Sequence, residues 1–136
     1  MNHWLLKTEP SEYSWDDLVR DGRAVWDGVT NALAQKHLRA IQAGDDVFVY
    51  HTATERRIVG IAHVTRAPFI DPKHPGGRLV VIEIEPVSPL VEPIPLEAMR
   101  ADTALAGWEL LRLPRLSVMP VPEAIWRRLL KGDSRR

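Results

Sequence analysis

Apolar and polar positions along this chain form several short segments with the pattern of β-strands. Such segments are apolar or alternating, rich in β-branched and aromatic residues, and bounded by Pro, Gly or Asp. Strands are predicted at residues 3–7, 47–51, 57–65, 79–87 and 115–120. The alternation of Ile82 and Ile84 with Glu83 predicts a strand buried on one side. Gly60, inside the third strand, indicates a bulge or a close backbone approach.

Other segments carry apolar residues at helical spacing behind recognisable helix starts. Ser14 and Asn31 are favoured N-cap residues, and Pro122 suits a first helical position. Helices are predicted at 14–20, 31–40 and 123–131, with shorter helical turns at 96–101 and 103–111. The Pro-rich stretches 68–78 and 88–95 are expected to be an exposed loop and a spacer. Strands and short helices without βαβ regularity predict one α+β domain, residues 1–136, around a small curved, mostly antiparallel sheet or barrel.

The stretch Trp26–Asn31 is the strongest candidate for a binding site. It joins a large aromatic side chain to Asp27-Gly28, which tolerates a left-handed turn, and then to the start of a helix. A flat, polar ligand could stack on the indole while its edge meets polar groups. The alternative is that Trp26 is an ordinary core residue beside a capped helix.

Three further groups of residues lie where predicted strands end. Lys7, Thr8 and Glu9 follow one another there, and strand geometry places Lys7 and Glu9 on one face with Thr8 pointing away. Such a Lys–Glu pair can do acid–base chemistry or hold a ligand, and the alternative is a weak surface ion pair. The other groups are Tyr50 with His51, and Arg115 with Ser117. A half-buried Tyr beside a hydrogen-bonded His explains the first of these equally well.

Composition excludes several classes of function. With 136 residues and no Cys, the chain has neither disulfides nor thiolate catalysis. Its five His are scattered and no phosphate-binding Gly-rich loop is present, so we expect neither a metal site nor a phosphate-binding loop of that kind. Without a long apolar run or a signal-peptide pattern, we expect a soluble, cytoplasmic protein without membrane contact. Because 18 basic residues balance 18 acidic ones, bulk electrostatic binding of a duplex is disfavoured and any nucleic-acid role needs a specific pocket.

Five short motifs occur in an order that resembles the EVE-domain family. They are Trp-Leu-Leu-Lys-Thr-Glu-Pro at 4–10, Trp-Asp-Gly-Val-Thr-Asn at 26–31, Val-Tyr-His at 49–51, Ile-Val-Gly-Ile at 58–61 and Arg-Leu-Ser-Val at 115–118. The resemblance covers nearly the whole chain. It implies a PUA-like fold, a bent and mostly antiparallel β-barrel flanked by short helices. It also implies a pocket for a modified base of DNA or RNA, without a cofactor.

Carried over position by position, the resemblance implies a set of base-binding residues. They are Lys7, Thr8, Glu9, Trp26, Val29, Asn31, Tyr50, His51, Arg115 and Ser117. The chain departs from many relatives at three positions: Thr8 stands where Ser is common, and Thr30 and Ala32 replace an Arg and a Tyr. The first change keeps the hydroxyl, whereas the other two can weaken backbone contacts or alter substrate size.

We therefore expect a non-enzymatic, monomeric domain that recognises a modified nucleobase, single-stranded or flipped out. Trp26 would provide the stacking wall, Asn31 and Glu9 would read the base edge, and Lys7, His51 and Arg115 would contact polar groups or phosphate. Flipping a base out of a duplex costs a few kcal/mol, and stacking it on an aromatic ring returns about 1–3 kcal/mol, so binding should be weak.

Two alternatives come from different classes of protein. One is a small amidohydrolase acting on modified nucleosides, like ASCH-type PUA relatives, with Lys7, Thr8 and Glu9 supplying its chemistry. The other is a protein-interaction module that uses the loop 68–78 and the basic C-terminal part, which holds Arg127, Arg128, Lys131, Arg135 and Arg136.

Overall fold

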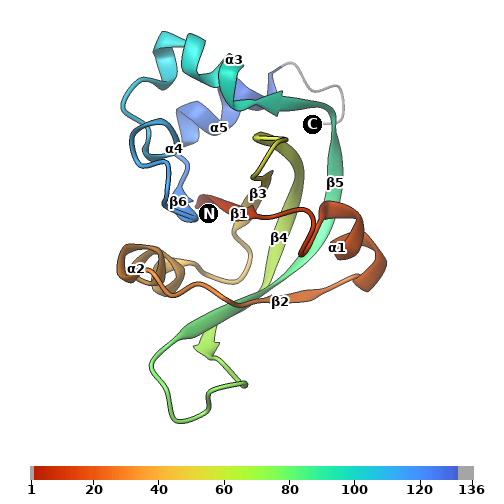
Figure 1. Ribbon diagram of the computed structural model, residues 1–136, viewed down its shortest axis with the longest axis vertical. Coiled ribbons are helices and arrows are strands. Elements are labelled where there is room, and N and C mark those ends of the chain that lie inside the picture. Colours follow the sequence, from red (N-terminus) through yellow and green to blue (C-terminus); the bar gives the residue numbers. More distant parts are fainter. Residues whose placement is uncertain (1, 132–136) are drawn as a thin grey trace.

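A curved sheet of six strands forms the centre of the structure, a computed structural model that describes residues 2–131 (Figure 1). The strand order is β2-β5-β4-β3-β1-β6. The strands are β1 (His3–Thr8), β2 (Ala24–Trp26), β3 (Asp46–His51), β4 (Arg57–Ile70), β5 (Val80–Pro95) and β6 (Val118–Pro120). β1 and β3 are parallel, and the other neighbouring pairs are antiparallel. The expected α+β class with a curved, mostly antiparallel sheet is confirmed.

Short helices flank this sheet, and two of them start at the predicted caps Ser14 and Asn31. They are α1 (Trp15–Asp21), α2 (Ala32–Ala40), α3 (Leu96–Ala101), the 3₁₀ turn η1 (Thr103–Leu105), α4 (Glu109–Arg112) and α5 (Glu123–Leu130). The Ser14 hydroxyl accepts from the amide of Asp17, and the Asn31 side-chain oxygen accepts from the amide of Ala34 at 3.0 Å. Pro122 precedes α5 as its N-cap rather than opening it.

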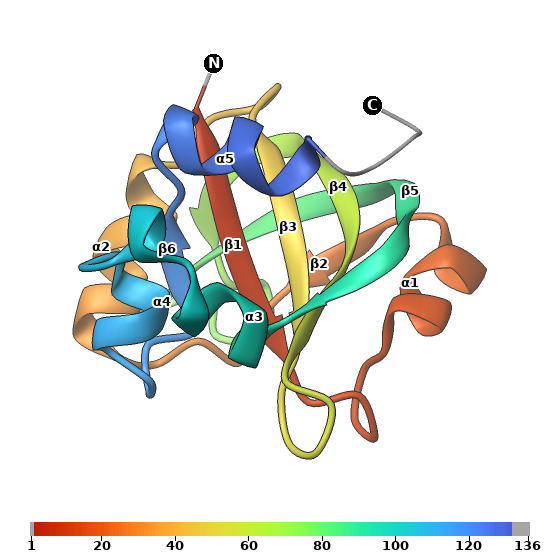
Figure 2. The same cartoon turned by 90° about the horizontal axis from the view of Figure 1, so that it is seen from above.

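α5 and α1 lie at opposite sides of the sheet. Figure 2 shows α5 lying across β1 and β3, while α1 lies beside β2. Trp126 of α5 stacks on Phe48 of β3 with ring centroids 3.9 Å apart, which fixes that helix on the core. On the other side, the Trp15 ring lies directly over Gly60, where an added Cβ would come within 2.6 Å of it. The strand register also shifts between Ile58 and Gly60, so the predicted irregularity and the predicted close approach at this glycine are both confirmed.

Four features of the predicted strands differ from the structure. Residues 88–95 are the second half of β5 rather than a spacer, because Pro is tolerated where a strand runs along the edge of a sheet. β2 was not predicted, since three residues are too few to show a period. The last strand begins at Val118, after a turn at residues 114–115, and β4 runs on to Ile70 before the exposed loop.

The basic C-terminal part is partly neutralised. Arg127 pairs with Glu123 at 3.1 Å and Arg128 pairs with Asp102 at 2.6 Å. Arg135 and Arg136 lie outside the described residues. Within residues 2–131, the helices are all too short or too polar to cross a membrane.

Candidate functional site

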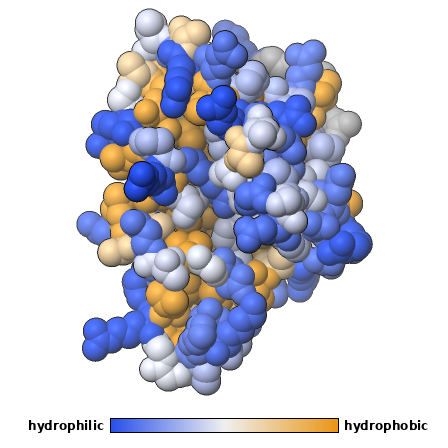
Figure 3. Space-filling model, in the orientation of Figure 1, coloured by the Kyte–Doolittle hydropathy of each residue, from blue (hydrophilic) through white to orange (hydrophobic). Residues whose placement is uncertain are grey.

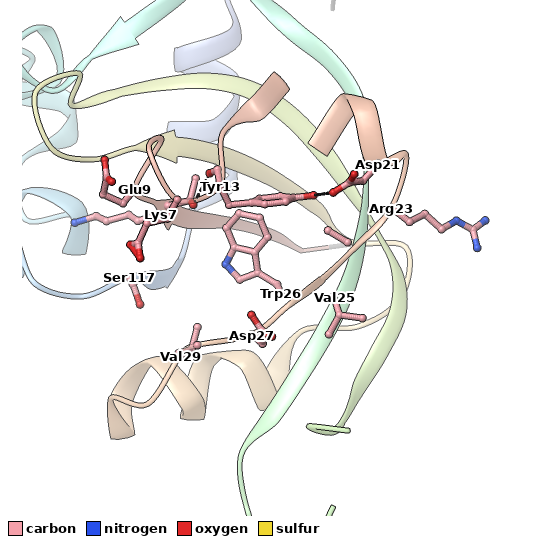
Figure 4. Close-up of a pocket in the computed structure, with 14 residues that line it drawn as sticks. Lys7, Glu9, Tyr13, Asp21, Arg23, Val25, Trp26, Asp27, Val29 and Ser117 are labelled. Atoms are coloured by element: carbon pink, nitrogen blue, oxygen red, sulfur yellow. Dashed lines mark hydrogen bonds between the residues drawn. The ribbon is translucent and has the colours of Figure 1, made fainter. Parts of the chain in front are cut away.

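A cavity of about 650 Å³ lies where β1 ends, between the segment before α1, the end of α1, β2 and the segment that leads into α2 (Figure 4). This volume falls within the range of about 300–1,000 Å³ that small-molecule sites occupy. Six of the ten predicted site residues line it: Lys7, Thr8, Glu9, Trp26, Val29 and Ser117. We refer to it as the Trp26 cavity.

Trp26 stands at the centre of this cavity and also belongs to the core. Its side chain is 7% exposed, and its backbone pairs with Ile82 of β5. The Tyr13 ring meets the indole edge-on, with centroids 6.1 Å apart and planes at 84°, a favourable aromatic arrangement. The core reading and the wall reading of Trp26 are therefore compatible. Gly28, with φ of 77°, turns the chain after it through a conformation that suits glycine.

The Tyr13 hydroxyl is held by Asp21 and completes the aromatic wall. It donates to Oδ2 of Asp21 at 2.8 Å, as the dashed line in Figure 4 shows. Burial, reinforced by this hydrogen bond, raises the pKa of Tyr13 to about 12. The phenol therefore stays protonated at neutral pH and keeps its ring beside Trp26.

Lys7, Thr8 and Glu9 reach the same cavity by different routes. The Lys7 backbone amide donates to the carbonyl of Ser117 at 2.9 Å, which places Ser117 on the cavity wall. The Thr8 hydroxyl donates to the carbonyl of Tyr13 at 2.7 Å, and the Glu9 carboxylate accepts from the amide of Ser11 at 3.3 Å. The side chains of Thr8 and Lys7 extend to opposite sides, as strand alternation predicted, since the Thr8 hydroxyl reaches Tyr13 whereas the Lys7 amine reaches Pro114.

The amine of Lys7 leaves the cavity on its far side. Its Nζ donates to the carbonyl of Pro114 at 2.9 Å and lies 5.5 Å from the centre of the Tyr50 ring. Figure 4 shows this side chain extending away from Trp26. Burial lowers the pKa of Lys7 from its ordinary value.

The other four predicted residues lie outside the Trp26 cavity. Asn31 and Arg115 line a neighbouring groove of about 350 Å³, where the Asn31 oxygen is used as the helix cap. Tyr50 lines a smaller cavity beyond Lys7. His51 is buried: its Nε2 accepts from the Trp15 amide at 3.0 Å, so Nδ1 carries the proton directed at Glu55, 2.9 Å away. Ligand contact by these four residues stays a prediction.

Sequence reasoning missed several groups that shape the cavity. Tyr13, Asp21 and Asp27 line it, and Tyr13 had a usable signal as an aromatic just before the Ser14 helix cap. Gln35 is buried behind the wall, where its amide nitrogen donates to the carbonyl of Val29 at 2.7 Å and its oxygen accepts from the Val80 amide. This side chain ties the segment after Trp26 to β5.

The Trp26 cavity is richer in acceptors than in donors. Glu9, Glu12, Asp21 and Asp27 contribute carboxylates to its lining, and Lys7 and Arg23 contribute cations. Asp27 also pairs with Lys73 at 2.7 Å. Arg23 extends away from Trp26 (Figure 4), and its guanidinium lies 3.9 Å from Glu83 and 3.8 Å from Glu85. Such a lining suits a flat ligand that offers N–H donors and carries no negative charge of its own.

The family model described as the EVE domain matches residues 2–132. This chain belongs to the EVE-domain family. Its fold is therefore the PUA-like α+β fold that the five motifs implied.

Relatives of known structure share this fold across nearly their whole length. Rpa0253 from Rhodopseudomonas palustris is 38% identical, with a TM-score of 0.91 over 96% of this chain and 92% of that one. Human THYN1, solved in complex with DNA containing 5-methylcytosine, has a TM-score of 0.90 at 24% identity, covering 100% of this chain and 99% of that one. In a comparison of sequences alone, mouse thymocyte nuclear protein 1 is 28% identical over 156 residues, covering 90% of this chain and 69% of that protein.

Proposed function

We propose that this EVE domain is a non-enzymatic binding domain that takes one modified base of DNA or RNA into the Trp26 cavity. The observation that carries the proposal is the pair of aromatic rings, Trp26 and Tyr13, which wall a cavity of base-accommodating size. A base has a π-face to lie against these rings and polar edges that can meet the surrounding groups. The complex of human THYN1 with DNA containing 5-methylcytosine supports the binding of modified nucleic acid by a domain of this fold.

The lining favours bases that carry an exocyclic amine. Carboxylates of Glu9 and Asp27 accept hydrogen bonds, and an N–H of a cytosine or adenine edge can supply them. A thymine or uracil edge presents carbonyl oxygens at the corresponding position and would meet these acceptors unfavourably. We therefore expect modified cytosine or adenine to bind more tightly than modified uracil.

A binding titration tests this function. Fluorescence anisotropy compares single-stranded oligonucleotides that differ in one base, unmodified or 5-methylated cytosine or N6-methylated adenine, as DNA and as RNA. Because base–aromatic stacking is worth about 1–3 kcal/mol, we expect Trp26→Ala to lower the affinity for the preferred modified oligonucleotide by roughly 5- to 150-fold. Equal binding of every oligonucleotide, or an unaffected folded Trp26 variant, would contradict the proposal.

Two companion variants separate loss of the site from loss of the fold. Truncating a buried Trp costs about 3–5 kcal/mol of stability, so Trp26→Ala is paired with Trp26→Phe, which keeps an aromatic face. Trp26→Phe should bind with an affinity between those of wild type and Trp26→Ala. The matched control is Trp108→Phe, because Trp108 is also a buried core residue but does not line the Trp26 cavity.

One observation favours a second candidate, a small amidohydrolase. Lys7, Thr8 and Glu9, which supply the three residue types, all line the Trp26 cavity. The Lys7 amine, however, donates to Pro114 and extends away from the cavity. Incubation with N4-acylated cytidines followed by chromatography decides the matter: a deacylated product that Glu9→Gln abolishes would establish catalysis. We expect no product.

A further inference from the structure

A second, smaller cavity opens on the far side of Lys7. It measures about 190 Å³ and is lined by Lys7, Tyr50, Thr52, Arg56, Arg100 and Pro114, among others. A water molecule takes about 30 Å³ of liquid volume, so this space suits one small group with a few waters rather than a nucleoside. Lys7 separates it from the Trp26 cavity and lines both.

Among the described residues that line this cavity, three are cations and none is a carboxylate. Lys7 contributes an ammonium, and Arg56 and Arg100 contribute guanidiniums. Within the described part of the chain, neither of these two Arg side chains has a hydrogen bond or an ion pair. Like charges gathered without a counter-charge repel one another, and an anion placed among them relieves that repulsion.

The loop that carries Arg56 is held in place by its backbone. The Thr52 amide donates to the carbonyl of Thr8 at 2.9 Å, and the Arg56 carbonyl accepts from the amide of Leu96 at the start of α3, also at 2.9 Å. Ala53 and Arg56 both have positive φ, at 61° and 47°, which non-glycine residues adopt uncommonly. A loop fixed in this conformation presents Arg56 toward the cavity without having to order on binding.

We propose that this second cavity is an oxyanion site that binds a phosphate group of the nucleic-acid backbone. Guanidinium groups recognise phosphate through paired N–H donors, and the Lys7 ammonium adds a point charge between the two cavities. The carboxylate-rich Trp26 cavity repels a phosphate, whereas the neighbouring cavity attracts one. One nucleotide can thus place its base against Trp26 and a flanking phosphate beyond Lys7. The identity of the anion as a nucleotide phosphate rests on the proposed function, whereas anion binding itself does not.

The test compares 5-methyl-2′-deoxycytidine with its 3′- and 5′-monophosphates by calorimetry. We expect one monophosphate to bind wild type at least about tenfold more tightly than the nucleoside, because charged hydrogen bonds are added. The double variant Arg56→Gln/Arg100→Gln should reduce this advantage to below about threefold while nucleoside affinity stays within about twofold. Arg57→Gln is the matched control, since Arg57 is the adjacent cation, pairs with Glu55 and does not line the cavity.

A second titration tests anion binding at this cavity independently of base binding in the Trp26 cavity. Inorganic phosphate is added to ¹⁵N-labelled wild-type protein, with sodium chloride at equal ionic strength as the reference. We expect phosphate-specific shifts at the amides of Lys7, Arg56 and Arg100, even if the nucleoside fails to bind. Absence of those shifts, or a double variant that keeps the full monophosphate advantage, would overturn the oxyanion site whether or not the Trp26 cavity binds a base. Equal shifts with acetate would reassign the site to carboxylates and overturn the phosphate assignment.

Discussion

Trp26 belongs to the hydrophobic core and also forms a wall of the candidate binding site. Trp26 is nearly buried and paired through β2, yet it borders the cavity beside the edge of Tyr13. Trp26 could be singled out from sequence because an Asp-Gly turn and a helix cap follow it. Tyr13 carried a weaker signal, its place just before the Ser14 helix cap, and its hydrogen bond to Asp21 forms only once α1 has folded.

At this scale, titration of Tyr13 gives a direct prediction. Burial and the Asp21 hydrogen bond raise the pKa of Tyr13 from about 10 to about 12, favouring the neutral phenol in the folded state. The resulting stabilisation is therefore fully present below pH 10 and is lost as the pH rises through 12. The measurement is phenolate absorbance at 295 nm in wild type and Tyr13→Phe, with Tyr50 common to both. A Tyr13 transition centred near pH 10 in the folded protein would contradict it.

At the scale of elements, the segments with strong local signals were predictable. Ser14 and Asn31 fixed two helix starts, and the alternation of Ile82 and Ile84 fixed the buried half of β5. The second half of β5 was not predictable, because its prolines suggest a spacer and its pairing with β4 is a long-range contact. The site shows the same division. Local motifs identified six cavity residues, whereas the burial of His51 between Trp15 and Glu55 depends on the docking of α1.

The packing of α1 on β4 is tested by Gly60→Ala. An added Cβ would lie 2.6–2.8 Å from three ring carbons of Trp15, so the helix must shift or the strand must bend. Overpacking of this kind costs roughly 1–3 kcal/mol of unfolding free energy, measured by urea denaturation. Gly76→Ala is the matched control, because a Cβ there meets nothing within 4 Å. Equal stability of both variants would show that Trp15 is not held against Gly60.

At the scale of the whole molecule, charge is separated locally although the net charge is zero. Carboxylates gather around Trp26, whereas cations gather beyond Lys7. Figure 3 shows hydrophobic side chains gathered mainly toward the left of the viewed face, with hydrophilic side chains predominating on its right. Affinity for nucleic acid should therefore depend on a few local contacts and one base.

The salt dependence of binding follows from this distribution. With about three cations contacting phosphate, log K should fall with log[salt] at a slope of about −2 for a single strand. The measurement is an anisotropy titration of a single-stranded 5-methylcytosine oligonucleotide, repeated at salt concentrations from about 50 to about 300 mM. A slope steeper than about −5, or tighter binding to an unmodified duplex, would instead indicate an extended electrostatic interface.

The central claim is that one base occupies the Trp26 cavity, and a crystal structure with the most tightly bound modified nucleoside tests it most directly. The predicted result is a base lying against the Trp26 indole beside Tyr13, with its exocyclic amine directed toward the carboxylates of Glu9 or Asp27. A base bound elsewhere, for example in the groove of Asn31 and Arg115, would contradict the account.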